Sequence, residues 1–328
     1  MLRRTFAASL LAAPTLLRPA HAQGATMRLA HQYPPAHHIA QVLQRFGEQV
    51  SARNAGLAVQ VFPAEQLAKV AENFPGVARG AFESAVATNF TWGNTIPEMS
   101  APTIPFLFTE LERIRKFPGS EAAQFLDAAS ERRGVKTLAW LFTTRMSIFT
   151  SGRKPLVTLD DLKGVKIRGI NALINTGLTA AGAAPANTPA PEVTQALGSG
   201  VLDAGLTDVS AAVSRRFYEV QKFGTVTPFF GVFTQLYVNP RWFAALPAAA
   251  RTALEEGAKA AEADAITATE ATAGAAVGEL RAKGMTIHEQ TAAETAAWKG
   301  VMQPPVIEAF LRAAPEGGQR ALDLLARL

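Results

Sequence analysis

Short apolar runs alternate along the chain with stretches in which apolar residues recur at helical spacing. Residues 57–62 alternate as a strand and stop at Pro63. Residues 38–52 show the three-to-four-residue repeat of a helix, with apolar side chains at Ile39, Val42, Leu43, Phe46 and Val50. This succession of strand and helix patterns is typical of α/β architecture.

The same patterns predict further elements along the chain. Strands are predicted over 27–30, 84–88, 135–140 and 165–168, and helices over 64–79 and 111–130. Segment 144–150 is expected to continue the strand 135–140 or to pair with it. The proline-broken segment 102–108 is expected to form a buried loop, and 160–164 a turn or short helix. In the strand 165–168, Lys166 and Arg168 share one face.

The longest unbroken helical pattern covers residues 246–283. It begins near Pro247 and is followed by Gly284, a usual stop for a helix. A single helix of this length would extend about 55 Å at 1.5 Å per residue. Because this exceeds the diameter of one domain, we expect it to cross between two domains. The alternative is a pair of antiparallel helices broken near Gly274.

The first 22 residues have the features of a cleavable export signal. Arg3 and Arg4 are followed by an apolar run over 6–17 and then by Ala20-His21-Ala22, a small-x-small site. The run is shorter than the roughly 20 residues that a bilayer span needs. We therefore expect export to the periplasm with cleavage after Ala22, by the twin-arginine or the Sec route. The alternative is a frayed amphipathic helix.

Composition and charge narrow the class of protein. The 328 residues are 48% hydrophobic and 18% charged, a globular composition with room for two domains. Loss of the signal removes three arginines and no acidic residue, so the formal net charge falls from +5 to +2. No Lys/Arg cluster remains that would neutralise a nucleic-acid backbone, which argues against a nucleic-acid partner. The absence of cysteine excludes disulfides and thiolate chemistry.

No motif in the sequence supports catalysis or a cofactor. The chain has no nucleophile elbow, phosphate-binding loop, dinucleotide fingerprint or zinc-protease motif. His31, His37 and His38 lie close together, but the last two are adjacent and would point about 100° apart on a helix. We therefore interpret them as solvated histidines at a helix start, with no metal and no cofactor expected. The pair Asp160-Asp161 is interpreted as a solvated turn.

Six segments, in order over residues 27–245, resemble the solute-binding proteins of TRAP transporters (tripartite ATP-independent periplasmic transporters). They are LAHQYPP at 29–35, VFPAEQL at 61–67, IPFLF at 104–108, DDLKGVKIR at 160–168, the set Glu192, Val193, Ala196, Leu197, Gly200 and Asp203, and FYEVQK at 217–222. The resemblance implies a two-domain periplasmic binding protein with hinge strands and a long domain-spanning helix. It also implies an N-domain of 26–144 plus 233–272, and a C-domain of 145–232 plus 273–328.

The resemblance implies that a small organic carboxylate is captured between the domains and passed to small and large membrane permease subunits. No catalysis is expected, and we expect a monomer. Two alternatives stay open: a binding protein of another importer or a sensor system, and a periplasmic enzyme that acts on an organic acid.

In this family the arginine at the end of the D-L-K-G-x-K-I-R strand pairs with the ligand carboxylate, and Arg168 occupies that position. A guanidinium offers a planar fork of donors that matches the two oxygens of a carboxylate. Asn171 follows at a position where relatives often have a polar pocket residue. Many relatives have a second arginine where this chain has Ser147, and Arg145 lies two residues earlier on the same strand face. Arg145 is therefore a second candidate.

Other departures from the family concern the ligand. The usual asparagine is replaced by Thr207, with Asp208 beside it, and a frequent aromatic is replaced by Ala190, which should widen the pocket. Asp208 would repel a second carboxylate and would suit a hydroxyl or an ammonium group. We therefore expect a monocarboxylate with polar or aromatic bulk rather than a simple C4-dicarboxylate.

Four of the five remaining candidates follow predicted strands, whose carboxyl ends face the cleft in open α/β sheets. For each of them, core packing or a loop role is the alternative. They are Gln32, Tyr33, Asn89, Trp92 and Phe230, the last with Phe229 as a possible wall of the pocket.

Overall fold

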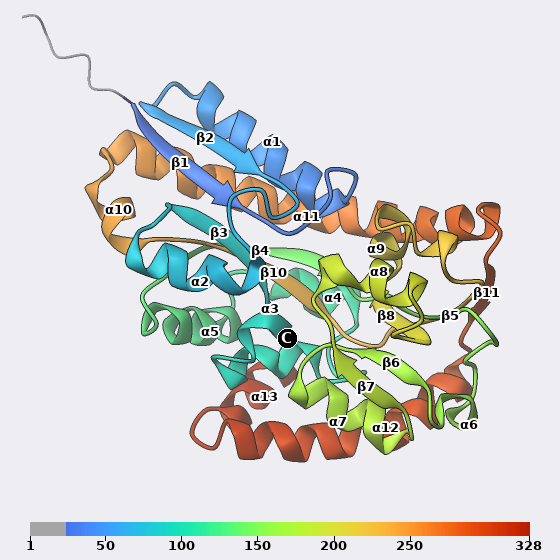
Figure 1. Ribbon diagram of the computed structural model, residues 1–328. Helices are drawn as coiled ribbons and strands as arrows, with labels where there is room; N and C mark the ends of the chain where they lie inside the picture. Colours follow the sequence, from blue (N-terminus) through green and yellow to red (C-terminus); the bar gives the residue numbers. More distant parts are fainter. Residues whose placement is uncertain (1–23) are drawn as a thin grey trace, which may run out of the picture.

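The computed structural model describes residues 24–328 and contains two β-sheets joined by helices (Figure 1). The predicted signal peptide lies outside the described residues. Within them, no helix is long and apolar enough to span a bilayer.

The first sheet is built mainly from the N-terminal part of the chain. Its spatial order is β2 (Leu57–Phe62), β1 (Ala25–Ala30), β3 (Ser84–Thr88), β10 (Val232–Val238) and β4 (Lys136–Thr144). The pairs β2–β1 and β1–β3 are parallel, and β10 is antiparallel to both of its neighbours. The edge strand β2 alternates between more and less buried positions, as its sequence pattern predicted, whereas β3 and β10 inside the sheet are buried along their whole length.

The second sheet comes from the middle of the chain. Its spatial order is β11 (Thr286–Glu289), β9 (Phe223–Thr227), β5 (Ser147–Ser151), β8 (Ala204–Asp208), β6 (Lys166–Gly169) and β7 (Ala184–Asn187). The strand β5 is antiparallel to β8 and β9. Segment 144–150 was therefore predicted wrongly: β5 neither continues nor pairs with β4, because the chain crosses into the other sheet at 145–146.

Helices cover both sheets. In the first half they are α1 (His38–Ala52), α2 (Val70–Arg79), α3 (Asn89–Trp92), η1 (Pro97–Thr103), α4 (Leu111–Lys116) and α5 (Glu121–Glu131). In the second they are α6 (Leu159–Leu162), α7 (Ala172–Ala180), η2 (Ala190–Glu192), α8 (Val193–Gly198), α9 (Val209–Ser214), η3 (Phe217–Glu219), α10 (Pro240–Ala245), α11 (Ala248–Ala282), α12 (Ala292–Ala313) and α13 (Gly318–Ala326).

Two helix predictions need correction. The helix expected over 64–79 begins only at Val70, because Ala64 and Glu65 have positive φ angles of 49° and 61°. The helix expected over 111–130 is two helices, α4 and α5, separated by a turn with Gly119 at φ 75°. A positive φ cannot be accommodated in a right-handed helix. The buried loop expected at 102–108 takes in the last residues of the 3₁₀ helix η1.

The predicted long helix is one continuous element. At 35 residues α11 extends about 52 Å. It packs against α1 and β4 on the first sheet and against α9 and β11 on the second, and Figure 1 shows it running across the upper part of the molecule from α10 toward β11. Gly274 lies in its interior, so the alternative of two antiparallel helices is wrong.

The boundaries given above for the two domains remain a prediction. The strands of each sheet follow the predicted boundaries, whereas the final helix α13 packs against α5 and η1, which cover the first sheet. The chain passes between the sheets at 145–146, at 228–231 and within α11. These crossings bring the carboxyl ends of β3, β6 and β8 to a common cleft.

One carboxylate on α11 gives the stability of the fold a predicted pH dependence. Burial, assisted by the charge of the neighbouring Asp127 and opposed by the Trp140 main-chain N–H and by Lys259, raises the pKa of Glu262 to about 7. Because the native state holds the Glu262 proton more tightly than the unfolded chain does, protonated Glu262 contributes its full stabilisation below the ordinary carboxyl pKa. This stabilisation is lost as the pH rises through 7. Glu262→Gln keeps an acceptor for the Trp140 N–H, 2.8 Å away, without the charge.

We therefore expect Glu262→Gln to raise the melting temperature relative to wild type at pH 8 and to have little effect at pH 5. The gain at pH 8 should be about 2–4 °C per kcal/mol of relieved burial penalty. Thermal unfolding at both pH values measures it. Glu255→Gln, on the exposed side of the same helix, is the matched control. An equal shift at both pH values would contradict the prediction.

Candidate functional site

A small polar pocket lies where the two sheets face each other. Its volume is about 40 Å³. Gln32, Tyr33 and His37 line it from the segment after β1, and Thr207 and Asp208 line it from the end of β8. Arg168 and Arg215 complete its polar wall, and Phe230 is one of its apolar residues. The structure thus brings together Gln32, Tyr33, Arg168, Thr207, Asp208 and Phe230 from the predicted set.

Arg168 is a buried cation near the end of β6. Its side chain is held by two main-chain carbonyl groups: Nε donates to Thr188 O at 3.1 Å and Nη1 to Leu206 O at 2.8 Å. These bonds use two of the five guanidinium N–H groups. Only 4% of the residue is exposed, and no ion pair within the described residues includes it.

The surroundings of Arg168 disfavour its charge. Burial lowers its pKa to about 9, and the positive charge of Arg215 acts in the same direction, while Asp208 opposes them. A buried guanidinium held only by neutral carbonyl groups carries an uncompensated desolvation cost. An anion bound at the remaining N–H groups would offset this cost.

Arg215, just after α9, is a second cation at the pocket and was missed in the sequence. Its Nη2 donates to Gln32 O at 3.2 Å, which links the two sides of the cleft. Burial lowers its pKa, and Asp208, Tyr33 and Glu65 oppose the shift. The adjacent Arg216 is exposed and pairs with Glu219. A pair of neighbouring arginines gives no sequence signal for which one turns inward.

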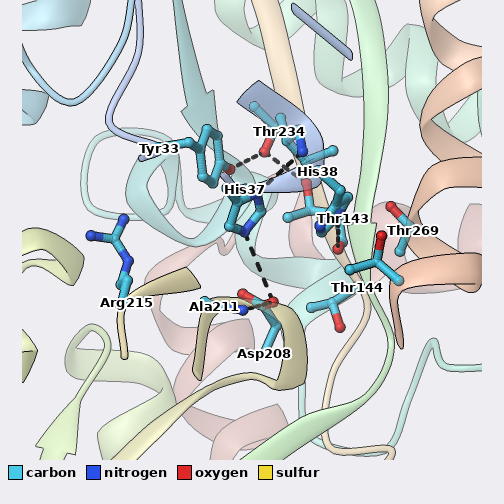
Figure 2. A network of polar contacts seen from close by, with 12 residues as sticks. Tyr33, His37, His38, Thr143, Thr144, Asp208, Ala211, Arg215, Thr234 and Thr269 are labelled. Carbon is cyan, nitrogen blue, oxygen red and sulfur yellow. Dashed lines mark hydrogen bonds and ion pairs between the residues drawn. The ribbon is translucent and has the colours of Figure 1, made fainter. Parts of the chain in front are cut away.

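Asp208 is the acidic group of the pocket. Its Oδ1 accepts a 2.7 Å hydrogen bond from Ala211 N and so caps α9. The same oxygen lies 3.9 Å from His37 Nε2 (Figure 2). Burial by itself would raise the pKa of Asp208, but His37, His38 and the Ala211 N–H hold it below its ordinary value. Asp208 is therefore a carboxylate that accepts hydrogen bonds.

His37 and His38 are buried, so the expectation of solvated histidines is wrong, although they do begin a helix. The rings of Tyr33, His37 and His38 pack in succession, with centroids 4.5 and 4.4 Å apart. His37 Nδ1 accepts from Ile39 N at 3.1 Å, so its proton lies on Nε2, on the side of Asp208. His38 Nε2 lies 3.1 Å from Thr143 O, and burial lowers the pKa of His38 to about 3.

Tyr33 is held as a neutral side chain. Its hydroxyl hydrogen-bonds with Thr234 Oγ1, which lies 2.7 Å from Thr143 Oγ1 (Figure 2). Burial raises the pKa of Tyr33 to about 12. The packed rings of Tyr33, His37 and His38 thus form one wall of the pocket beside Asp208.

Arg145 does not line the pocket, which corrects its place as a second candidate for the carboxylate. It makes a bidentate ion pair with Glu270 of α11, at 3.0 and 2.8 Å. Ser147 is fully buried within β5, opposite Asp208 and Thr227. Arg145 is already paired and Ser147 is uncharged, so neither provides a free cation to the cleft.

Of the remaining predicted residues, two make structural hydrogen bonds and one lines a neighbouring cavity. Asn171 caps α7 through Oδ1 and donates from Nδ2 to Phe90 O at 3.0 Å. Asn89 Oδ1 accepts from Phe233 N at 3.2 Å. Neither side chain lines the pocket. Trp92 lines a larger cavity next to it.

Residues 29–313 match the DctP family, described as bacterial extracellular solute-binding protein, family 7. The chain belongs to this family. A relative from Rhodobacter capsulatus, the C4-dicarboxylate-binding periplasmic protein DctP, is 29% identical over 254 residues, 76% of each chain. The 2,3-diketo-L-gulonate-binding periplasmic protein YiaO of Escherichia coli is 29% identical over 186 residues, 56% of each chain.

Solved DctP-family structures share the fold. DctP7, a Bordetella pertussis extracytoplasmic solute receptor binding pyroglutamic acid, is 25% identical with a TM-score of 0.83, over 92% of this chain and 99% of that one. A TRAP periplasmic solute-binding protein from Sulfitobacter with bound β-D-galacturonate is 20% identical with a TM-score of 0.85, over 92% and 100%. The predicted TRAP resemblance and two-domain binding-protein fold are therefore confirmed.

Proposed function

We propose that this protein captures a small organic carboxylate in the cleft between its two sheets and delivers it to a TRAP permease. One observation carries the proposal: Arg168 is a buried guanidinium without an anionic partner among the described residues, and three of its N–H groups remain free. A carboxylate would satisfy both its charge and its donors.

Arg215 adds a second positive charge, so the pocket favours an anion over a neutral solute. The relatives support the same chemistry, since C4-dicarboxylates, 2,3-diketo-L-gulonate and pyroglutamic acid are all organic acids. We propose Arg168, Arg215, Gln32 and Thr207 as ligand contacts. We further propose Asp208 as an acceptor for a ligand hydroxyl or N–H group.

The proposal includes the cellular setting. The protein would act as a monomer in the periplasm after removal of the signal peptide, and would present the closed form to small and large permease subunits. The crossings at 145–146 and 228–231 would serve as the hinge. No chemical change of the ligand is expected.

The test combines mass spectrometry with thermal unfolding. The purified protein is examined by native mass spectrometry for a co-purified acid, and is then unfolded with and without a panel of mono- and dicarboxylates. A ligand that binds the native state alone raises the melting temperature with concentration. We expect an acid to do so and to be recovered unchanged. Conversion of the acid would identify an enzyme, and stabilisation only by uncharged solutes would refute the proposal.

A further inference from the structure

A second and larger cavity adjoins the polar pocket. Its volume is about 490 Å³, within the range of small-molecule sites. The residues Gln32, Phe90, Arg168, Ile170 and Ala190 line both cavities. A ligand carboxylate on Arg168 would therefore have the larger cavity beside it. We call this larger cavity the aromatic chamber.

The aromatic chamber is named for the rings along its wall on the side of the first sheet. Phe74 of α2 packs on Trp92 of α3 with centroids 4.8 Å apart at 62°, and Trp92 packs on Tyr237 of β10 at 5.3 Å and 63°. These edge-to-face arrangements fix the orientations of the three rings. Trp92 and Tyr237 are 2% and 0% exposed, whereas Phe74 and Phe90 are partly exposed. The aromatic surface that a flat apolar group would meet is therefore that of Phe74 and Phe90.

The charged side chains along the wall of the aromatic chamber also constrain the ligand. Among its described lining residues Arg168 is the only charged side chain. Burial raises the pKa of Tyr237, so its hydroxyl stays neutral. A second carboxylate placed in the chamber would have no cation of its own, because Arg215 lines the polar pocket and not the chamber. The chamber therefore disfavours the second carboxylate of a dicarboxylate.

The volumes of the two cavities indicate where each part of the ligand would lie. The polar pocket, at about 40 Å³, is much smaller than the chamber, at about 490 Å³, so it accommodates the smaller, polar end of a ligand. The rest of any larger ligand must lie in the chamber. Ala190 lines both cavities, and its side chain is a single methyl group, so it takes up little of the space between them.

We propose that the ligand is a monocarboxylate with an aryl or similarly flat apolar body, its carboxylate on Arg168 and its body in the aromatic chamber. This inference rests on the proposed function, because it uses the same arginine. It makes Ala190 a specificity-determining residue: a bulky side chain there would separate the chamber from the carboxylate.

The test uses propionate and 3-phenylpropionate, two acids that differ by one phenyl group, with succinate as a dicarboxylate. Calorimetry on the full mature chain should show 3-phenylpropionate binding at least about tenfold more tightly than propionate or succinate. Ala190→Trp should bring the ratio between the phenyl acid and propionate close to one. Ala184→Trp, on the exposed part of β7 outside both cavities, should keep the wild-type ratio.

The outcomes separate this inference from the proposed function. If both monocarboxylates bind equally and lose affinity in Arg168→Ala, the arginine site stands and the aromatic inference is refuted. A phenyl preference that survives Ala190→Trp, or a preference for succinate, also refutes it. If no acid binds wild type, the proposed function fails and this inference fails with it.

Discussion

Arg168→Ala is expected to lower the affinity for a carboxylate ligand by about 2–5 kcal/mol, roughly 30-fold to several thousand-fold. The substitution removes the buried cation that lies at both cavities, and it leaves the ligand anion in a cleft with poor access to water. Isothermal titration with whichever acid stabilises the wild type measures the loss. Thermal unfolding of the ligand-free variant establishes that it is folded.

Two further variants separate the geometry of the guanidinium from its charge. Arg168→Lys retains a positive charge but not the fork of donors held by Thr188 O and Leu206 O, so we expect it to recover only part of the affinity. Lys166→Ala removes a cation from the exposed part of the same strand and should bind like wild type. Equal losses in Lys166→Ala and Arg168→Ala would show that only the overall charge matters, and unchanged affinity in Arg168→Ala would disprove its role.

Gly231→Ala is expected to destabilise the fold by about 3 kcal/mol, at the upper end of the usual range for overpacking. A Cβ at this position would lie 2.1 Å from the main-chain oxygen of Phe108. A backbone atom cannot rotate away as a side chain can. The nearby main-chain bond from Phe106 N to Phe229 O, 2.6 Å long, holds the same two segments together.

Urea unfolding of Gly231→Ala measures the loss of stability, and Gly274→Ala is its matched control. Nothing lies within 4 Å of a Cβ built on Gly274, which is inside α11. Alanine is favoured over glycine in a helix by about 0.8–1.0 kcal/mol, so the control should be stabilised. If Gly231→Ala unfolded at the same urea concentration as wild type, the close contact with Phe108 would not constrain the fold.

The elements that were predicted accurately are those with a strong local signal. The helix at 38–52 and the strands at 57–62 and 84–88 have the predicted boundaries in the structure. Each of these elements is specified by the periodicity of its side chains and by the residues at its two ends, all of which lie within a few positions along the chain. The errors at 64–69, at 117–120 and at 144–150 arise where a positive φ or the choice of a partner strand decides the structure.

The sequence by itself determined the alternation of strands and helices, the single long helix and the family, and it singled out Arg168 as the candidate for binding a carboxylate. Only the tertiary structure decided which other arginine accompanies it. Arg145 is neutralised by Glu270, which lies 125 positions further along the chain on α11, whereas Arg215 turns inward to Gln32. Strand alternation is a local property, but the charge that an arginine offers to a ligand depends on which acidic groups the fold brings to it from elsewhere.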